Sequence, residues 1–336
     1  MIERRATSAD PAAEHAAVRG AVGIVDRSDH GVLEVTGRDR ATFLHAMLSN
    51  DVTSLAPGQG CMATLLDVHG KVQVLLRVLV LDDRILIVTP PEFAERTQAA
   101  LDTYLFSEKA YFRDASGEHA LFVLAGPEAP GLAQRVGGAV PAERAWSHVT
   151  GAVKEAAVRL VRGSGETGEA EIWVIAPAAD GDAVWEAFRA AGATPVGRAA
   201  AESLRIEAGT PAFPDDMGPS VLLPEVPFAD LVSYTKGCYI GQEVVVRIRD
   251  RGHVNRLLRA LVLEADAVPV SGAPVLAGEA EVGKVTSASW SYDHKRPVAL
   301  ALVRRQHAEP GTRLAVRVGE TTVSATVAEP RAGTPR

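Results

Sequence analysis

Apolar residues along the first 250 positions recur with two different periods, and these periods predict strands and helices that intermix. Alternation of apolar and polar residues between turn-forming residues is typical of strands. The strands predicted in this way cover 31–37, 61–68, 71–81, 84–89, 120–124, 156–162 and 170–175. Helical spacing of apolar residues predicts helices over 38–48, 90–104, 180–191 and 198–208. Intermixed elements of both kinds are typical of an α/β or α+β fold.

The pattern changes near residues 250–256. Short strand-like runs follow, separated by turns at Ser271-Gly272, Ala277-Gly278 and Pro310-Gly311, and no long helical pattern accompanies them. Runs of this kind predict a small all-β unit. We therefore expect a mixed helix and strand region over 1–250 and a β-barrel over 256–330.

The composition excludes several classes of protein. The 336 residues are too many for one ordinary core and suit two or three domains. A net charge of −7 argues against a general nucleic-acid binder, which needs a basic surface. The two cysteines, Cys61 and Cys238, lie far apart, which argues against a disulfide framework and fits a reducing compartment. Because the chain has neither an apolar run of ~18 residues nor a signal-peptide core, we expect a cytoplasmic protein without membrane contact.

One octet, from Lys236 to Glu243 (KGCYIGQE), is the most specific stretch of the chain. It places Cys238 between two glycines and beside a lysine, and a basic run follows it. Such electropositive surroundings favour a thiolate. The alternative is that Cys238 is a small buried apolar residue and that the glycines form a turn.

All eight residues of the octet match the signature of the YgfZ-type folate-binding proteins, which the chain resembles. That family is related to the T-protein of glycine cleavage and is linked to assembly or repair of iron–sulfur clusters. The resemblance implies a T-protein-like α+β fold, with two interleaved α/β subdomains around a central folate channel and a C-terminal β-barrel. The second subdomain is expected over about 52–115. The resemblance also makes Cys238 the functional thiol.

The segment 202–209 (ESLRIEAG) is the second informative stretch. Taken alone, Arg205 and Glu207 near the end of a helix are typical of a surface ion pair worth less than about 1 kcal/mol. The segment resembles, however, the T-protein and YgfZ stretch whose glutamate holds the pteridine of tetrahydrofolate. One carboxylate can accept hydrogen bonds from both N3–H and the 2-amino group of that ring. The resemblance therefore assigns Glu207 to the pteridine.

The basic run after the octet is a candidate for the anionic tail of a folate. If 245–249 is a strand, alternation puts Arg247 and Arg249 on one face, where guanidinium groups suit carboxylates. Solvated surface charge is the alternative. The full set of predicted folate-binding residues is Glu207, Arg205, Lys236, Tyr239, Gln242, Arg247 and Arg249, and we expect no resident metal site.

One motif of the T-protein is missing. The stretch His69 to Leu75 aligns with a T-protein segment that ends in two aspartates, one of which activates the folate. Val74 and Leu75 occupy these positions here. Neither side chain can transfer a proton, which removes general acid–base help of about 10²–10⁴-fold. This departure argues against a glycine-cleavage aminomethyltransferase.

The lead hypothesis is a tetrahydrofolate-binding accessory protein that supports iron–sulfur enzymes. Its expected partners are reduced folate and iron–sulfur proteins or cluster-assembly factors, and a transient iron–sulfur cluster at the thiol is left open. The alternatives are a folate-dependent transferase or demethylase acting on a small amine, and a scaffold that has lost its ligand. We expect a monomer.

Overall fold

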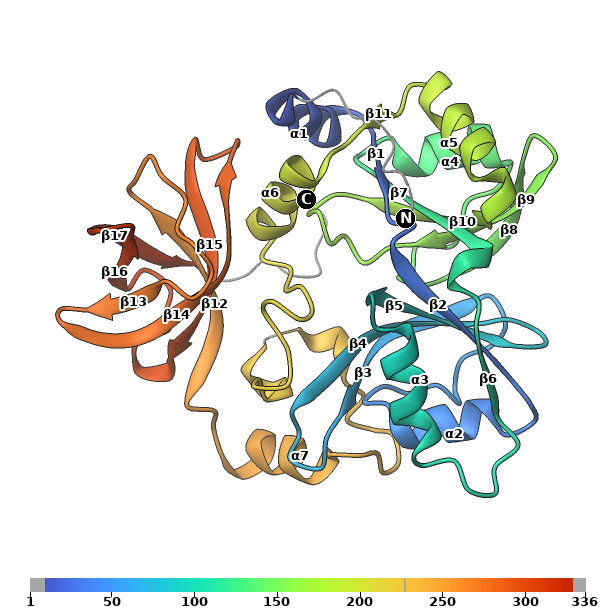
Figure 1. The fold of residues 1–336 in the computed structure, drawn as a ribbon, viewed down its shortest axis with the longest axis horizontal. Coiled ribbons are helices and arrows are strands. Elements are labelled where there is room, and N and C mark those ends of the chain that lie inside the picture. Colours follow the sequence, from blue (N-terminus) through green and yellow to red (C-terminus); the bar gives the residue numbers. More distant parts are fainter. Residues whose placement is uncertain (1–9, 227, 329–336) are drawn as a thin grey trace.

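A computed structural model describes residues 10–226 and 228–328 of the chain. Two sheets and one barrel hold all its strands (Figure 1). The first sheet has six strands, in the order β11 (Thr194–Pro195), β1 (Gly23–Asp26), β7 (His119–Ala125), β10 (Glu171–Pro177), β9 (Ala156–Arg162) and β8 (His148–Val153). Only the β1–β11 pair is parallel.

The second sheet is antiparallel throughout and has five strands. Its order is β3 (Gln59–Leu66), β4 (Val72–Val80), β5 (Ile85–Pro91), β2 (His30–Thr36) and β6 (Tyr111–Asp114). The chain starts in the first sheet, builds the whole second sheet, and then returns to the first. The two units are therefore interleaved, as predicted. The second sheet also takes β2, which precedes the expected range 52–115.

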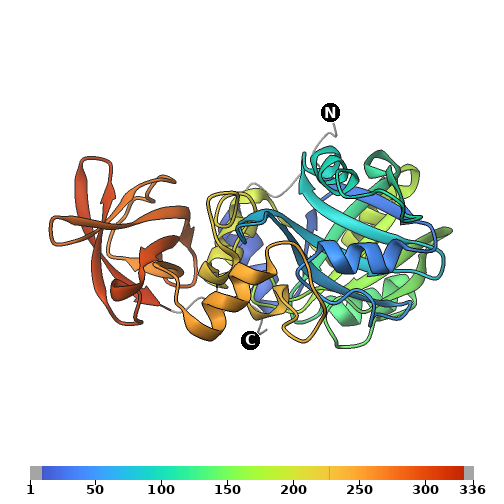
Figure 2. The ribbon, with the colours of Figure 1, turned by 90° about the horizontal axis from the view of Figure 1, so that it is seen from below.

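The C-terminal strands close into a barrel. Its order is β12 (Arg256–Leu263), β15 (Arg296–Arg304), β14 (Ala280–Ser291), β13 (Pro274–Ala277), β16 (Arg313–Val318) and β17 (Thr321–Ala328). Alternate residues of these strands fill the interior, which has its own apolar core. The barrel lies at one end of the molecule, beyond the two sheets (Figure 2). The predicted α+β architecture, with two interleaved units and a C-terminal barrel, is confirmed.

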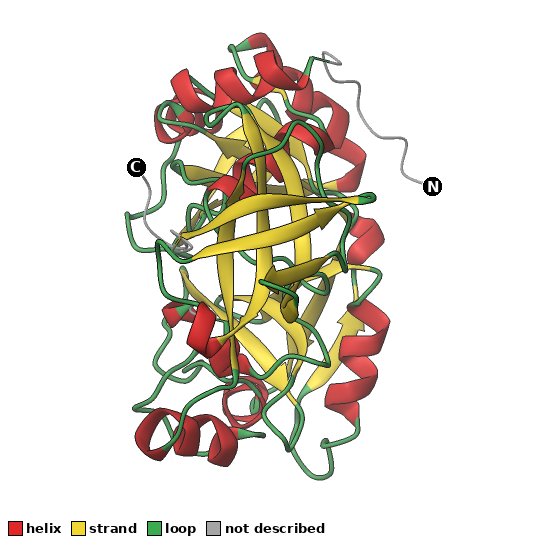
Figure 3. Ribbon diagram, turned by 90° about the vertical axis from the view of Figure 1, so that its left-hand side faces the viewer, coloured by secondary structure: helices red, strands yellow, loops and turns green. Residues whose placement is uncertain are grey.

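Helices flank the layers of strands (Figure 3). They are α1 (Pro11–Gly20), α2 (Arg40–Met47), α3 (Ala94–Asp102), α4 (Ala129–Gly137), α5 (Gly181–Ala190), α6 (Arg198–Glu207) and α7 (Gln242–Arg251). α4 and α5 cover one face of the six-stranded sheet and bury Leu132 and Phe188 there. The other face joins the five-stranded sheet in one large core, which explains why β7 is apolar on both faces. No helix of the described residues has the length and hydropathy of a membrane span.

α7 corrects one prediction. Residues 245–249 were expected to form a strand, but they lie within a helix that begins after Gly241. Gly241 has φ +80°, and a Cβ there would lie 2.5 Å from the carbonyl oxygen of Asp67. Only glycine fits such a position. The turn directs Val245 into the core, and this single buried position suits a helix that touches the core with one face.

Candidate functional site

Lys236, the first residue of the octet, caps the C-terminus of α2. Its ammonium group donates to the backbone oxygens of His45, of Leu48 at 2.6 Å and of Asn50 at 3.1 Å. The last carbonyls of a helix lack partners within the helix and carry partial negative charge, so a cation is stabilising there. Burial lowers the pKa of Lys236 to about 8. These three hydrogen bonds of the Lys236 ammonium therefore anchor the octet to the end of α2.

Replacing Lys236 by Met is expected to lower the free energy of unfolding by about 2–3 kcal/mol, because carbonyls of α2 lose a charged donor. Urea denaturation measures the change. Lys284→Met is the matched control, since Lys284 is exposed and lies 3.9 Å from Glu281. An equal effect of the two substitutions would contradict the capping role.

Cys238 is exposed, whereas the other cysteine, Cys61, is buried. Burial raises the pKa of the Cys61 thiol to about 12, so Cys61 stays a thiol at neutral pH. Cys238 follows the buried Lys236 and precedes Tyr239, which is 7% exposed. The buried Lys236 and Tyr239 thus fix the backbone on both sides of Cys238, while Cys238 itself stays exposed.

The remaining predicted residues of this region are spread around α7. Tyr239 lies with its ring centroid 5.0 Å from the Lys236 ammonium, and its buried hydroxyl has no partner among the described residues. Burial raises the pKa of Tyr239 to about 12. Gln242 is half-buried at the start of α7. Because successive helical positions are 100° apart, Arg247 and Arg249 do not share one face as predicted.

The two arginines differ in their contacts. Arg249 lies 4.4 Å from the ring centroid of Tyr234 and donates to Asp250 at 2.6 Å. Arg247 is exposed. The two guanidinium groups are therefore not positioned in this structure to bind one anionic tail together.

Glu207 lies in a different neighbourhood, where α1, α6 and the barrel meet. One carboxylate oxygen accepts from His15 at 2.8 Å and from Arg19 at 2.7 Å. The other accepts from Ser291 at 2.6 Å and from Ser203 at 3.1 Å. Although burial opposes ionisation, His15, Ser291 and Arg19 together lower the pKa of Glu207 to about 2.

This geometry gives Glu207 a structural role, and its contact with a pteridine stays a prediction. The side chain is 1% exposed, and both oxygens are already engaged by protein donors. A pteridine edge would have to displace these partners to bind. Glu207 instead joins α6 to α1 and to the start of the β14–β15 turn, which holds the barrel against the rest of the chain.

Arg205 is also a structural residue. Its guanidinium donates to Asp216 at 2.7 Å, to the backbone oxygen of Thr210 at 2.7 Å and to Glu202 at 2.8 Å. Asp216 in turn accepts from Ser287 of the barrel at 2.7 Å. The side chain of Arg205 therefore links α6 through Asp216 to the barrel, and it is buried within these contacts.

A cluster that the sequence reasoning did not identify lies between the two sheets. Arg77 on β4 is 6% exposed and donates to one oxygen of Glu166, with Nη2 at 2.6 Å and Nε at 3.2 Å. Its guanidinium carbon lies 4.7 Å from the ring centroid of Trp173 and 5.7 Å from that of Trp146. We call these four residues the Arg77 cluster. It combines one cation, one carboxylate and two aromatic rings.

The loop between β9 and β10 presents Glu166 to this cluster. Gly165 and Gly168 have φ near +80°, and Glu171 accepts from the backbone and hydroxyl of Thr167 at 2.7 and 2.8 Å. A Cβ on Gly163 would lie 2.6 Å from Glu171, so the loop can close only with glycine there. The glycine-rich run GSGETG between two strands is the signal in the sequence that marks this loop.

Several polar atoms of this region are buried without a hydrogen bond among the described residues. They are Nε1 of Trp146, Nε1 of Trp173 and one carboxylate oxygen of Glu171. Native interiors pair nearly all such atoms, so a local group of unpaired ones indicates a place for a ligand or water. Trp146 also has φ +65°, which is uncommon for a residue other than glycine.

The carboxyl groups in and beside the Arg77 cluster differ in pKa. Burial opposes ionisation of Glu166, but Arg77 holds the pKa of Glu166 below its ordinary value. Burial raises the pKa of Glu171 to about 7, and the Glu166 charge adds to the increase. His30, whose ring centroid lies 5.9 Å from that of Trp173, has a pKa lowered by burial. The site therefore holds one firmly ionised carboxylate beside one carboxyl that exchanges its proton near neutral pH.

Val74 and Leu75 are buried on β4, as expected for apolar residues in a central strand. Strand alternation puts Leu75 and Arg77 on the same face.

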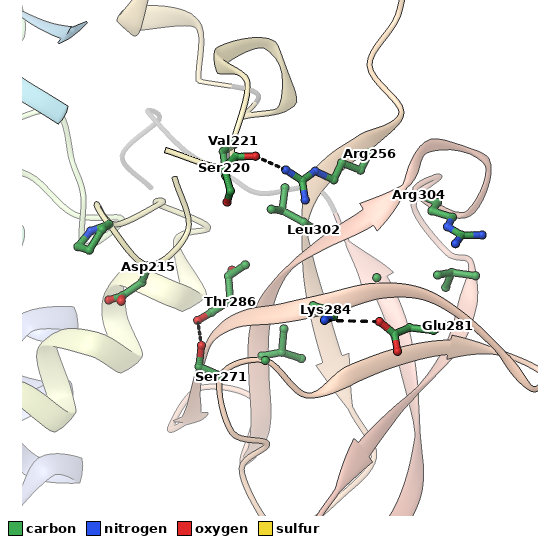
Figure 4. Close-up of a pocket in the computed structure, with 15 residues that line it drawn as sticks. Asp215, Ser220, Val221, Arg256, Ser271, Glu281, Lys284, Thr286, Leu302 and Arg304 are labelled. Carbon is green, nitrogen blue, oxygen red and sulfur yellow. Dashed lines mark hydrogen bonds and ion pairs between the residues drawn. The ribbon is translucent and has the colours of Figure 1, made fainter. Parts of the chain in front are cut away.

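Two cavities lie away from this cluster. One, of about 400 Å³, lies between barrel strands and the segment 214–221, where Arg256 donates to the backbone oxygen of Ser220 at 2.6 Å (Figure 4). The other, of about 500 Å³, is lined by Glu34, Arg84 and Arg159, among others. Neither is lined by Cys238 or Glu207.

Comparison of the sequence with models of known protein families identifies the family of this chain. Residues 3–236 match the GCVT N-terminal domain, and residues 256–332 match the glycine cleavage T-protein C-terminal barrel domain. The chain belongs to the glycine cleavage T-protein family. The narrower YgfZ-type assignment, which rests on the octet around Cys238, stays a prediction.

Individual relatives agree with this family. The chain is 34% identical over 307 residues to an aminomethyltransferase of Frankia alni, a match covering 89% of this chain and 83% of the relative. It is 31% identical over 344 residues to a probable aminomethyltransferase of Halobacterium salinarum, covering 95% and 89%. The crystal structure of aminomethyltransferase T from Bartonella henselae shares the fold, with a TM-score of 0.86 at 22% identity, covering 97% of this chain and 91% of that chain.

Proposed function

We propose that this T-protein family member binds a reduced folate between its two sheets, at the Arg77 cluster, and supports iron–sulfur enzymes through Cys238. The observation that carries the folate assignment is the cluster itself. It offers a carboxylate, stacking rings and unpaired polar atoms in one buried place. A pterin fits this combination, because it presents adjacent N–H donors on a planar pyrimidine ring.

Glu166 takes the role that was first given to Glu207. Its side chain is 18% exposed, against 1% for Glu207, so a ligand can reach it. Only one of its oxygens accepts hydrogen bonds within the described residues. The other oxygen is available for the N3–H and 2-amino group of a pterin.

Replacing Glu166 by Gln tests the pocket. We expect tetrahydrofolate to bind the unaltered protein and the Gln variant to bind it about 10- to 150-fold more weakly, because a charged acceptor is lost. Anaerobic titration calorimetry measures both affinities. Glu186→Gln, an exposed glutamate on α5, is the control and should leave the affinity unchanged. If the unaltered protein gives neither heat nor a thermal shift with tetrahydrofolate, only the scaffold alternative remains.

The role in iron–sulfur metabolism rests on the octet. Its resemblance to the YgfZ signature supplies the class of client, and the exposure of Cys238 makes the thiol available to a partner or to iron. The absence of an aspartate at positions 74 and 75 favours this accessory role over glycine cleavage. The client proteins, the monomeric state and a transient cluster stay predictions.

Glu171 favours the transferase alternative. A carboxyl whose pKa is near 7 and whose second oxygen has no partner among the described residues can take up and release a proton. It would supply, from another strand, the acid–base group that Val74 and Leu75 cannot. Turnover of tetrahydrofolate with aminomethyl or N-methyl donors separates the two functions. Turnover that Glu171→Gln abolishes would establish the transferase, and its absence in the folate-binding protein favours the accessory role.

A further inference from the structure

The cavity between the barrel and the segment 214–221 gathers positive charge (Figure 4). Its volume of about 400 Å³ is sufficient for a small ligand. Three strands of the barrel each contribute one cation to its wall: Arg256 on β12, Lys284 on β14 and Arg304 on β15. Two carboxylates, Asp215 and Glu281, also line it. Because the chain as a whole has a net charge of −7, this excess of cations is a local feature.

The register of the barrel brings these like charges together. Arg256 and Arg304 are direct partners in the antiparallel β12–β15 pair. Lys284 is the direct partner of Leu302, which puts it diagonal to Arg304 on the same face. Direct partners lie about 5 Å apart at Cβ and diagonal ones about 7–8 Å, and like charges in direct register are destabilising. An anion bound among these cations would offset their repulsion.

The protein neutralises the three cations to different degrees. Arg256 donates to both oxygens of Glu225, at 2.7 and 3.2 Å, so its charge is already paired. The Lys284 ammonium lies 3.9 Å from Glu281, which is beyond hydrogen-bond distance. The exposed Arg304 guanidinium has neither an ion pair nor a hydrogen bond among the described residues. Lys284 and Arg304 therefore have donors for an anion that enters the cavity.

The other lining residues orient such an anion. In the view of Figure 4, Asp215 lies at the opposite end of the cavity from Arg304, with Val221 and Leu302 between them. Val221 is 4% and Leu302 8% exposed, and both contribute apolar surface to the wall. An anion is attracted to the Arg304 end and repelled from the Asp215 end. The charges therefore favour one end of the cavity for the anionic group.

We propose that this cavity is a second binding site, which takes the oxyanion group of a small ligand, a phosphate or a carboxylate, between Lys284 and Arg304. A guanidinium offers two parallel donors to either group, and an ammonium adds a compact charge. A ligand with two or more oxyanion groups binds best, because it can meet both cations. No residue of the Arg77 cluster lines this cavity, and neither does Cys238, so the site is separate from the proposed folate site and from the thiol.

Calorimetric titration with pyrophosphate and with tricarballylate, at one fixed ionic strength, tests the site. The unaltered protein should bind at least one of the two anions with a Kd below about 1 mM. Arg304→Gln should weaken this binding about tenfold, because charge-assisted hydrogen bonds are lost. Asp215→Asn should strengthen it, since the substitution removes a like charge from the cavity. Arg317→Gln is the matched control, because Arg317 is an exposed arginine on β16 of the same barrel and does not line the cavity.

The two anions also distinguish the sources of the oxyanion. Tighter binding of pyrophosphate supports a phosphorylated ligand, and tighter binding of tricarballylate supports a polycarboxylate, provided that Arg304→Gln weakens it. Equal weakening by Arg304→Gln and Arg317→Gln would show attraction to the barrel surface in general and overturn the site. Absence of binding of both anions to the unaltered protein up to about 10 mM would overturn it as well. Neither result affects the folate site, which tetrahydrofolate titration tests separately.

Discussion

Replacing Glu207 by Ala is expected to lower the free energy of unfolding by about 3–5 kcal/mol, the range for removing one partner of a buried ion pair. The substitution leaves Arg19 and His15, both largely buried, without the acceptor that they share. It also removes the acceptor of Ser291, and with it a direct bond between α6 and the barrel. We therefore expect looser docking of the barrel in addition to lower stability.

Chemical denaturation measures this loss, and limited proteolysis near residues 252–256 reports the docking of the barrel. The control is Glu186→Ala, because Glu186 forms an exposed ion pair with Arg189 on α5 and should contribute less than about 1 kcal/mol. A Glu207 variant as stable as this control would contradict the structural role. Loss of folate affinity without loss of stability would instead restore the original assignment of Glu207 to the pteridine.

The same residue predicts a dependence on pH. The pKa of Glu207 is about 2 in the folded chain, against about 4.3 for an ordinary glutamate. A depressed folded pKa stabilises the protein above the unfolded value, and this contribution disappears as the pH falls from about 4 to 2. The Glu207→Gln variant should lack this part of the acid transition. Parallel acid-unfolding curves for the two proteins would exclude the effect.

Replacing Cys238 by Ala is expected to abolish support of iron–sulfur enzymes in cells while leaving fold and folate affinity nearly unchanged. The thiol is exposed, so its removal costs little packing, and the neighbouring anchors Lys236 and Tyr239 remain. No alanine side chain can ligate iron or exchange with another thiol. The functional effect should therefore be complete where the structural effect is small.

Activities of iron–sulfur enzymes in a strain that depends on this protein measure the effect of Cys238→Ala, together with melting temperature and folate titration of the purified variant. Cys61→Ala is the matched control, because Cys61 is buried with a pKa of about 12 and is not available as a thiolate. Full activity of the enzymes with the Cys238 variant would remove the thiol from the mechanism.

Much of the fold was predictable because local patterns agree with the tertiary structure. The hairpin of β3 and β4 follows from alternation around His69-Gly70, and β7, β9 and β10 follow from short apolar runs. The β-only C-terminal region follows from the loss of helical spacing. α7 was not predictable in this way, because Val244 to Val246 have strand propensity. The left-handed Gly241 and the single buried position of Val245 fix the helix.

The candidate site, like the fold, was predictable in part from the sequence and in part only from the tertiary structure. The sequence by itself determined the T-protein-like architecture and an octet that is distinctive in its residues, and it showed that no carboxylate stands at positions 74 and 75. Only the tertiary structure decided what Glu207 and Arg77 do, because their partners come from distant parts of the chain. Glu207 finds His15 192 positions away, and Arg77 finds Glu166 89 positions away. Whether a polar group finds all its hydrogen-bond partners depends on such tertiary contacts. Both oxygens of Glu207 are bonded to protein donors, whereas the Arg77 cluster keeps indole N–H groups without a partner among the described residues.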